Sequence, residues 1–521
     1  INVYMTFEIV FVLLSLLGMV AALIADKMRP GMILFSVVVL FLCAGILTPK
    51  EMLEGFSNKG MITVALLFLV SEGIRQSGTL GQVIKKLLPQ GKTTVFKAQL
   101  RILPSVAFIS AFLNNTPVVV IFAPIIKHWA KSVNLPATKF LIPLSYVTIL
   151  GGICTLIGTS TNLVVHGMIL EAGFEGFSMF ELGKVGIFIA IAGIIYIFLF
   201  SKRLLPDARP DTAVPDEEVE EGEKLHRVEA VLGARFPGIN KKLKDFNFQR
   251  HYGAEVKEIK TRNGQRFVSN LEEVVLHEGD TLVVMADDTF IPTWGESSVF
   301  VLLTNGNEPD TTGKKKRWFA LLLLVLMIVG ATVGELPVTK EMFPDIKLDM
   351  FFFVSITTII MAWTNLFPAR KYTKYISWDI LITIACAFAI SKAMVNSGVA
   401  DSVAKFIIGL SDDYGPHVLL AMVFIITNLF TELITNNAAA ALAFPLALSI
   451  SAQLGVSPTP FFVVICMAAS ASFSTPIGYQ TNLIVQGIGN YKFTDFVRIG
   501  LPLNIITFLI SVILIPLIWN F

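Results

Sequence analysis

The chain has 521 residues, of which 54% are hydrophobic and only 15% are charged, and its formal net charge is +2. This composition excludes an ordinary soluble core and indicates a polytopic membrane protein, and the small net charge gives no support for nucleic-acid binding. The sequence has no P-loop, nucleophile elbow or zinc-ligand spacing, and its four cysteines lie apart in apolar segments. We therefore expect no enzymatic activity, no disulfide framework and no metal-cluster site.

The first half of the chain, residues 1–204, predicts five membrane crossings. Its first apolar run is longer than a signal-peptide core and has no small-residue cleavage pattern, so we expect a retained span. A basic, amphipathic stretch after the third run is expected to lie along the membrane surface. The crossings are expected at about 4–24, 31–47, 61–77, 139–168 and 182–201.

Residues 99–132 form two apolar segments that are each short for a full span, joined at a polar tip over 114–116. Basic residues flank both outer ends, which predicts a re-entrant helical hairpin with both ends on the same side. The next crossing, 139–168, is broken by a polar stretch over 155–162. Irregular backbone at this depth is tolerated only where protein or a wet cavity satisfies its polar groups.

Residues 205–316 interrupt the membrane pattern. They begin with an acidic, proline-containing linker over 206–224, for which we expect no regular structure. Alternating apolar residues over 228–231 and 277–285 then predict strands of a small soluble α/β unit.

The second half, residues 317–521, repeats the order of the first. Residues 161–167 and 481–487 are identical at five of seven positions, and similar runs extend outward with the same spacing between the copies. We therefore interpret the chain as two copies of one membrane unit. The crossings are expected at about 317–335, 348–366, 377–396, 460–488 (broken) and 497–520, with a hairpin over 416–453 whose tip is 435–437.

An odd number of crossings in each copy turns the second copy upside down, which predicts an inverted repeat. Loop charges give an independent indication, because basic clusters fall on one side and acidic residues on the other. The positive-inside rule makes the basic side, which carries the inserted unit, cytoplasmic, and it places both termini on the opposite side of a plasma or inner membrane. The acidic residues are Glu171, Glu175, Glu181, Asp412 and Asp413.

The two tips and two breaks gather polar residues where water is scarce, at a cost that function usually justifies. Helix N-termini at such breaks favour anions, and hydroxyl, amide and carbonyl oxygens suit sodium. A cation or proton carrier generally needs a carboxylate at its site, and we expect none here. The alternative interpretation, that these residues only cap broken helices, is disfavoured by four motifs in symmetric register.

The tips Asn114-Asn115-Thr116 and Thr435-Asn436-Asn437 resemble the paired Ser-Asn-Thr hairpin motifs of the divalent anion/sodium symporters. These are the sulfate and dicarboxylate carriers of the ion transporter superfamily. The breaks Ile157-Gly158-Thr159 and Pro476-Ile477-Gly478 resemble that family's unwound helices. The chain departs from the pattern at the first residue of both tips and at the last residue of the second. The resemblance covers both membrane halves.

This resemblance implies sodium sites built by each tip with its facing break, a substrate between the tips, homodimers and elevator-type alternating access. Sodium is then the coupling ion, and no cofactor is expected. Substrate binding is assigned to Asn114, Asn115, Thr116, Thr161, Thr435, Asn436, Asn437 and Thr481. Sodium binding is assigned to Asn115, Gly158, Thr159, Asn162, Asn436, Thr475, Gly478 and Asn482.

Residues of about 226–290 resemble a TrkA-C domain, the regulatory module of potassium-transport proteins, with remnants of a second copy at 296–305. The presence of this module favours the sulfate-type branch of the family. The identity of any ligand that it binds is left open.

Several titratable residues lie within the apolar runs. Glu72 and Lys392 occupy equivalent positions in the two copies, and we expect structural roles for both, with local partners unless both side chains reach the centre. Glu432 precedes the second tip, where a satisfied structural carboxylate is favoured over a cation ligand. His166 has Gln486 as its counterpart, which disfavours a symmetric proton relay.

The sequence thus predicts an all-α polytopic membrane protein with two inverted repeats, re-entrant hairpins and broken helices, and a small inserted α/β unit. Its predicted function is sodium-coupled symport of a small divalent anion, sulfate first. A sodium-coupled dicarboxylate carrier, a cation/proton antiporter of the same superfamily and a channel gated by the soluble unit are the alternatives.

Overall fold

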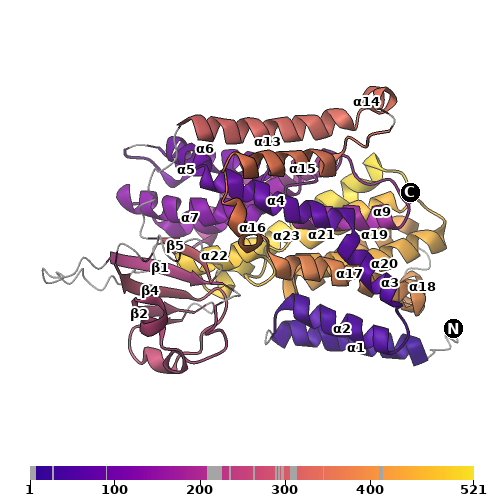
Figure 1. The fold of residues 1–521 in the computed structure, drawn as a ribbon, viewed down its shortest axis with the longest axis horizontal. Coiled ribbons are helices and arrows are strands. Elements are labelled where there is room, and N and C mark those ends of the chain that lie inside the picture. The colour runs from indigo at the N-terminus through magenta and orange to yellow at the C-terminus, as the bar shows by residue number, and fades with distance from the viewer. Residues whose placement is uncertain are drawn as a thin grey trace, which may run out of the picture.

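The fold is known from a computed structural model, which is mostly helical with a small sheet at one end (Figure 1). Within the described residues, eight helices are long and apolar enough to cross a membrane. The predicted linker lies outside the described residues apart from its first two positions, as do Asp412 and Asp413. The described residues are 7–25, 28–89, 91–207, 226–233, 236–261, 265–287, 290, 294, 299–304, 314–343, 345–409 and 415–521.

The first half consists of peripheral helices, a helical hairpin, a broken helix and a long final helix. The hairpin is formed by α6 and α7, and the broken helix by α8 and α9. Its helices are α1 (Phe7–Ala25), α2 (Pro30–Cys43), α3 (Pro49–Glu54), α4 (Lys59–Gln76), α5 (Thr79–Leu87), α6 (Val95–Ser110), α7 (Asn115–Ser132), α8 (Leu141–Gly152), α9 (Ser160–Glu171) and α10 (Gly183–Leu204).

The second half has the same order of elements, with its hairpin in α19 and α20 and its broken helix in α21 and α22. Several boundaries keep a constant separation between the halves: α4 and α17 end at 76 and 396, and α9 and α22 begin at 160 and 480. Its helices are α13 (Lys314–Gly334), α14 (Pro337–Met342), α15 (Met350–Trp363), α16 (Tyr372–Tyr375), α17 (Trp378–Asn396), α18 (Val399–Gly409), α19 (Gly415–Leu433), α20 (Asn436–Leu454), α21 (Thr459–Ser470), α22 (Gln480–Gly489) and α23 (Phe493–Ile518).

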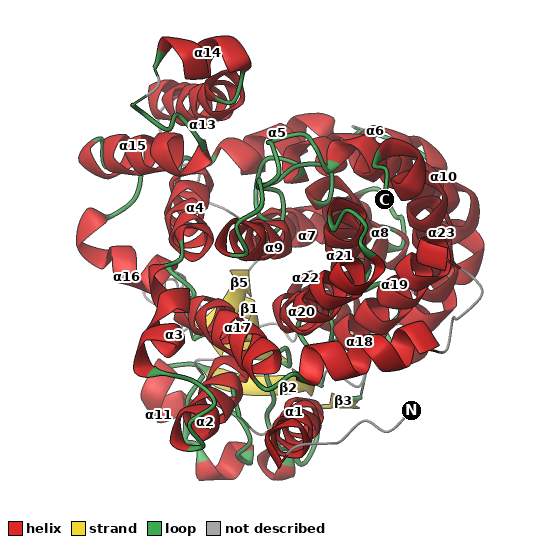
Figure 2. Ribbon diagram, turned by 90° about the vertical axis from the view of Figure 1, so that its right-hand side faces the viewer, coloured by secondary structure: helices red, strands yellow, loops and turns green. Residues whose placement is uncertain are grey.

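The two halves interlock rather than standing side by side. Helix α4 of the first half packs against α15 of the second, and α17 of the second half packs against α2 of the first. The inner hairpin arms α7 and α20 and the broken helices lie inside, where α20 contacts α9 and α22 contacts α7, whereas α6 stands at the edge of the bundle (Figure 2). The polar tips and breaks therefore lie in the interior of the bundle.

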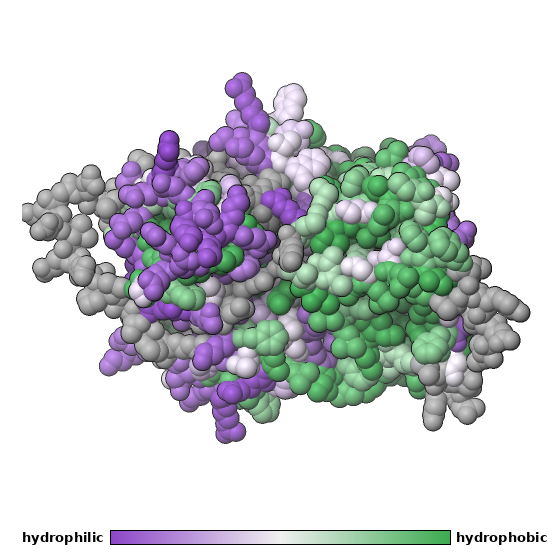
Figure 3. All heavy atoms as spheres, turned by 90° about the horizontal axis from the view of Figure 1, so that it is seen from below, coloured by the Kyte–Doolittle hydropathy of each residue, from purple (hydrophilic) through white to green (hydrophobic). Residues whose placement is uncertain are grey.

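The outer surface of the helices is apolar, as a lipid-facing surface requires. Large aliphatic side chains on α10 are about half exposed, including Ile187 at 52% and Ile191 at 53%, and α23 exposes Ile513 at 58%. Figure 3 shows an extended apolar face on one side of the molecule and a hydrophilic region on the other, over the inserted unit. The predicted class, a helical membrane protein with a small inserted α/β unit, is confirmed.

The inserted unit is an antiparallel sheet of five described strands in the order β3-β2-β4-β1-β5. A cluster of aromatic side chains, among them Phe236, Phe246 and Tyr252, packs in its core. The predicted strand over 228–231 is present in β1, and of the predicted 277–285 only 281–285 are strand, in β4, because 277–280 form the turn before it. The strands are β1 (His226–Leu232), β2 (Glu255–Lys260), β3 (Arg266–Phe267), β4 (Thr281–Ala286) and β5 (Phe300–Thr304), and the short helix α11 is Phe248–Tyr252.

The inserted unit docks on the membrane part at α7 and α22. Glu229 of β1 accepts two hydrogen bonds of 2.9 Å from Lys127 Nζ of α7. On α22, a Cβ placed on Gly487 would lie 2.5 Å from Thr281 Oγ1 of β4, so the two backbones approach closely. The unit thus contacts one arm of a hairpin and one segment of a broken helix.

By length and composition alone, α19 and α20, of 19 residues each, qualify as membrane spans, whereas α6 and α7 do not. The expectation of short hairpin arms therefore describes the first hairpin better than the second. The interpretation of α19 and α20 as a hairpin depends on their polar tip at 435–437 and on their correspondence with α6 and α7.

Candidate functional site

Four helices of the described chain begin at the two tips and the two breaks. They are α7, α9, α20 and α22, and their N-cap residues are Asn114, Thr159, Thr435 and Tyr479. None of these four side chains makes a capping hydrogen bond to its own helix. The alternative interpretation as simple helix caps is therefore wrong for Asn114, Thr159 and Thr435, whose side chains leave the first N–H groups of their helices uncapped.

Tyr479 connects the two halves at the centre of the site. Its hydroxyl accepts a hydrogen bond of 2.7 Å from Asn115 Nδ2 and lies 2.9 Å from Thr159 Oγ1. The first tip and both breaks thus meet at one hydroxyl group.

Other bonds also cross between the halves. Asn437 Oδ1 of the second tip accepts from Ser160 Oγ at 3.2 Å and from Thr161 Oγ1 at 3.3 Å. At the first tip, Thr116 Oγ1 donates to Gln480 Oε1 at 3.3 Å. The residues predicted from the sequence therefore do come together, although they lie up to 364 residues apart along the chain.

Thr481 and Asn482 lie deeper, against the first broken helix. The Ser145 hydroxyl of α8 donates to Asn482 Oδ1 at 2.7 Å and lies 2.9 Å from Thr481 Oγ1. Both side chains are fully buried. Thr481, predicted to bind substrate, is thus occupied by this contact rather than by the tips.

Each break has the same internal bonding. Thr155 donates to the carbonyl of Ala111, and its counterpart Thr475 donates to the carbonyl of Glu432 at 3.0 Å. The amide nitrogens of Asn162 and Asn482 donate to the carbonyls of the two threonines at 2.8 and 3.1 Å. The amide nitrogens thus hold the breaks together, and the amide oxygens face elsewhere.

Gly158 and Gly478 lie where the backbone leaves no room for a side chain. A Cβ on Gly158 would lie 2.5 Å from the carbonyl oxygen of Gly152 and 3.0 Å from that of Ala111. A Cβ on Gly478 would clash with Ser472 Oγ and the carbonyl oxygen of Thr431. These glycines bring several backbone and hydroxyl oxygens close to each tip.

Some oxygens of the site have no hydrogen-bond partner. Asn162 is fully buried, and its Oδ1 is unpartnered, as is Thr435 Oγ1 at the second tip. A buried acceptor needs a donor or a cation, so the free Asn162 Oδ1 is suited to a cation, whereas the Thr435 hydroxyl can also donate to an anion. The amide oxygens of Asn115 and Asn436 each accept one hydrogen bond, from Ser110 Oγ and from the Asn437 N–H.

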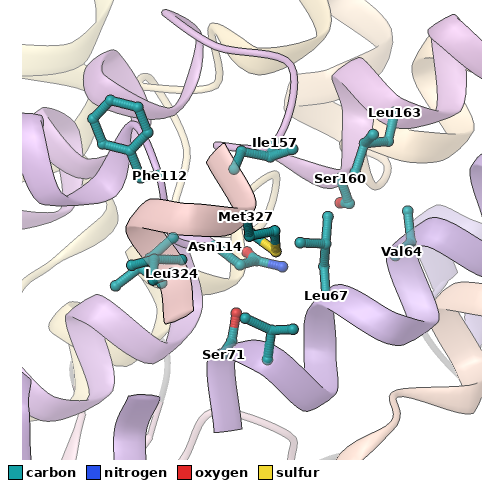
Figure 4. Close-up of a pocket in the computed structure, with 12 residues that line it drawn as sticks. Val64, Leu67, Ser71, Phe112, Asn114, Ile157, Ser160, Leu163, Leu324 and Met327 are labelled. Atoms are coloured by element: carbon teal, nitrogen blue, oxygen red, sulfur yellow. The ribbon is translucent and has the colours of Figure 1, made fainter. Parts of the chain in front are cut away.

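A small cavity of about 10 Å³, room for about one water molecule, adjoins the first tip (Figure 4). The Asn114 side chain points into it from the tip, with Ser71 of α4 and Ser160 of α9 on its edge and Met327 of α13 across it. The side chain of Asn114 thus lies between its own hairpin and the peripheral helices α4 and α13, and not between the two tips.

The tips and breaks themselves contain no carboxylate, but Glu432, which precedes the second tip, is hydrogen-bonded in the structure, as expected of a satisfied carboxylate. Glu432 Oε1 accepts from the Ser474 N–H at 2.9 Å and from Asn504 Nδ2 at 2.7 Å. Ser474 belongs to the second break, so Glu432 is part of the second site. The first break has no counterpart to this carboxylate.

Glu72 and Lys392 do not pair in the structure. Glu72 bonds to Arg75 and Gln76 within α4 at 2.6–2.7 Å, and Lys392 is exposed. Local partners are thus observed for Glu72, as the structural interpretation expected.

Sequence reasoning missed Tyr479, Ser145, Gln480 and Asn504 as site residues. Tyr479 and Gln480 lay within the recognised break, and Tyr479 is the counterpart of Thr159 in the second copy, so the repeat could have singled it out. Ser145 and Asn504 lie inside apolar helices, and the sequence carries no signal that they reach the breaks.

A polytopic helical bundle with polar breaks and uncapped helix N-termini at its centre defines a membrane transporter. Solved structures support this at the level of the fold: the YdaH transporter of Alcanivorax borkumensis matches with a TM-score of 0.52 at 12% identity over 98% of each chain. The chain belongs to the family described as "CitMHS: Citrate transporter", whose model matches residues 20–452 and 347–521.

Two relatives show how similar this chain is in sequence to other transporters. The "Uncharacterized transporter sll0640" of Synechocystis sp. is 30% identical over 93% of each chain. The "Sodium/sulfate cotransporter 2" of Chlamydomonas reinhardtii is 31% identical over 54% of this chain and 31% of its own length. All of these similarities are to transporters rather than to enzymes.

Proposed function

We propose that the protein is a secondary active transporter that couples the uptake of a small divalent anion, sulfate, to sodium. The observation that carries the proposal is the meeting of four uncapped helix N-termini among uncharged tip and break side chains, with Glu432 beside the second break. The name of the Chlamydomonas relative, a sodium/sulfate cotransporter, agrees with this chemistry.

The helix N-termini supply attraction for an anion. Each helix carries about half a positive charge at its N-terminus, and its free N–H groups donate directly to an anion. Among the described side chains that bond between the tips and breaks, none is Arg or Lys. A compact dianion needs only such convergent donors, whereas two separated carboxylates are better held by a bidentate cationic clamp.

The oxygens of each tip and its facing break supply the sodium sites. Sodium is a hard cation, which oxygen ligands suit. The first site consists of Asn115, Gly158, Thr159 and Asn162, and the unpartnered Asn162 Oδ1 supports it. The second site consists of Asn436, Thr475, Gly478 and Asn482.

The transport cycle is proposed to be an elevator-type movement of the hairpins and broken helices against the peripheral helices, in a homodimer. The matching order of elements in the two halves supports an inverted repeat, and the family resemblance supplies the movement and the dimer. The insertion over 205–316, with its TrkA-C-like module at about 226–290, is proposed to face the cytoplasm, opposite both termini.

Uptake of radiolabelled sulfate and succinate into proteoliposomes tests the proposal, with an inward sodium gradient compared with potassium at fixed pH. We expect sodium-driven sulfate uptake that thiosulfate, selenate and molybdate block and that succinate and citrate do not. Sodium-driven succinate flux without sulfate flux would reassign the protein to the dicarboxylate carriers. Flux that ignores sodium and follows the proton gradient would favour the antiporter alternative.

A further inference from the structure

Glu432 gives the second site a charge that the first site lacks. Three donors reach its carboxylate: the Ser474 N–H and Asn504 Nδ2 at Oε1, and Ser472 Oγ at Oε2, at 3.4 Å. The described part of the chain shows no ion pair to it. A half-buried carboxylate without a cationic partner is costly in a membrane protein, and it marks a functional position by default.

Closing the break does not require this carboxylate, as the first half demonstrates. Ala111 is the counterpart of Glu432, because the carbonyls of both residues accept the hydrogen bond of the break threonine. Gly186 and Gly500 pack equivalently, against the carbonyls of Ile153 and Phe473. Four residues after these glycines stand Ala190 and Asn504, so an Ala–Ala pair replaces Glu–Asn in the first half.

Asn504 adds a second observation. It is only 6% exposed, its Nδ2 donates to Glu432 and to Ser474 Oγ, and its Oδ1 has no hydrogen-bond partner. The Thr431 carbonyl and Ser472 Oγ approach Gly478 on the same side of the break. A carboxylate, a free amide oxygen, a hydroxyl and a carbonyl together make a ligand set for a hard cation.

We propose that Glu432 and Asn504 provide a charged ligand and an amide ligand to the sodium ion at the second tip, which makes the two sodium sites unequal. The inference deepens the proposed function and rests on it. The sodium ion bound at Glu432 neutralises the carboxylate, so this site crosses the membrane without net charge when loaded, whereas the neutral first site carries a full positive charge.

The test is the substitution Glu432→Gln, which keeps the shape of the side chain and removes its charge. We expect the sodium concentration for half-maximal sulfate uptake to rise at least tenfold and the sodium Hill coefficient to fall. Sodium should also raise the Tm of the purified variant, relative to choline, by less than it raises the wild-type Tm. Asn504→Ala, which installs the residue of the first half, should shift both measurements in the same direction and serves where Glu432→Gln folds poorly.

Glu181→Gln is the matched control. Glu181 is likewise half-buried and likewise accepts from one backbone N–H, that of Ser178 at 3.0 Å, and from one side-chain N–H, that of Trp519 at 3.2 Å. Because Glu181 lies outside the tips and breaks, the sodium dependence of sulfate uptake by the Glu181→Gln variant should match that of the wild type.

Unchanged sodium dependence in both Glu432→Gln and Asn504→Ala, with a sodium-dependent wild type, would overturn this inference and leave the proposed function standing. A wild type without sodium dependence would overturn the proposed function itself. If Glu432→Gln loses pH dependence but keeps its response to sodium, the carboxylate binds a proton and the sodium assignment is wrong.

Discussion

Single asparagines carry the first test of the sodium sites. Asn115 and Asn436 occupy equivalent positions at the start of α7 and α20, and each amide oxygen uses one hydrogen bond and keeps a second lone pair for a cation. We expect Asn115→Ala and Asn436→Ala each to raise the half-saturating sodium concentration, measured as sodium-dependent sulfate uptake. Asn396→Ala, at an exposed asparagine that bonds to Glu51, is the control. Normal sodium dependence in both tip variants would exclude the assignment.

At this scale the sequence predicts some contacts and misses others for a clear reason. Asn115, Thr159 and Asn437 stand out because polar residues are costly in an apolar run. Tyr479 does not stand out in this way, because aromatic rings are common in apolar cores and only its hydroxyl is polar. Its partners Asn115 and Thr159 are 364 and 320 residues away, a distance over which local patterns carry no information.

Among the elements, the broken helices depend on close backbone approach. A Cβ on Gly478 would clash with Ser472 Oγ and with the Thr431 carbonyl, and the carbonyl belongs to α19 and cannot yield without moving that helix from the break. We expect Gly478→Ala to destabilise the protein by about 1–3 kcal/mol, the usual cost of overpacking, and to abolish uptake. Gly18→Ala is the control, because no atom lies within 4 Å of that added Cβ. Thermal unfolding and uptake of the two variants give the comparison, and a fully active Gly478→Ala would contradict the role assigned to the break.

The order and type of the elements follow well from apolar periodicity and the repeat, and the helix starts at 160 and 480 lie within the predicted breaks. What the sequence could not predict is which helices of one half pack against which helices of the other half. The packing of α4 on α15 and of α17 on α2 joins the two halves, and such pairings depend on tertiary contacts with no local signature.

For the whole molecule, the ion pair between the inserted unit and the first hairpin is the contact to test. Burial alone would raise the pKa of Glu229, but Lys127 and Lys260 outweigh it and lower that pKa to about 2. The contact therefore stabilises the docked state fully above about pH 4.5 and loses this contribution as the pH falls towards 2. Removing Lys127 should cost less than the roughly 3 kcal/mol of a fully broken buried pair, because Lys260 Nζ still donates to Glu229 at 3.4 Å.

A double-mutant cycle of Lys127→Met and Glu229→Gln measures this coupling. We expect an interaction energy of about 0.5–3 kcal/mol from thermal unfolding, together with faster proteolysis of the inserted unit in either single variant. Glu273→Gln is the control, because Glu273 pairs with Lys242 and Lys244 on an exposed surface, where such pairs contribute little. Additive effects of the two substitutions would show that Lys127 and Glu229 do not hold the unit in place.

The bond between the Thr159 and Tyr479 hydroxyls joins two residues that hold the same position in their respective halves. In the proposed elevator movement the hairpins and broken helices travel together, so a bond between a tip and a break stays intact as the site crosses the membrane. The Thr159–Tyr479 bond and the bond from Asn115 to Tyr479 join the two halves within this moving part. The part of the protein that moves is therefore cross-linked at its centre by residues from both copies of the repeat.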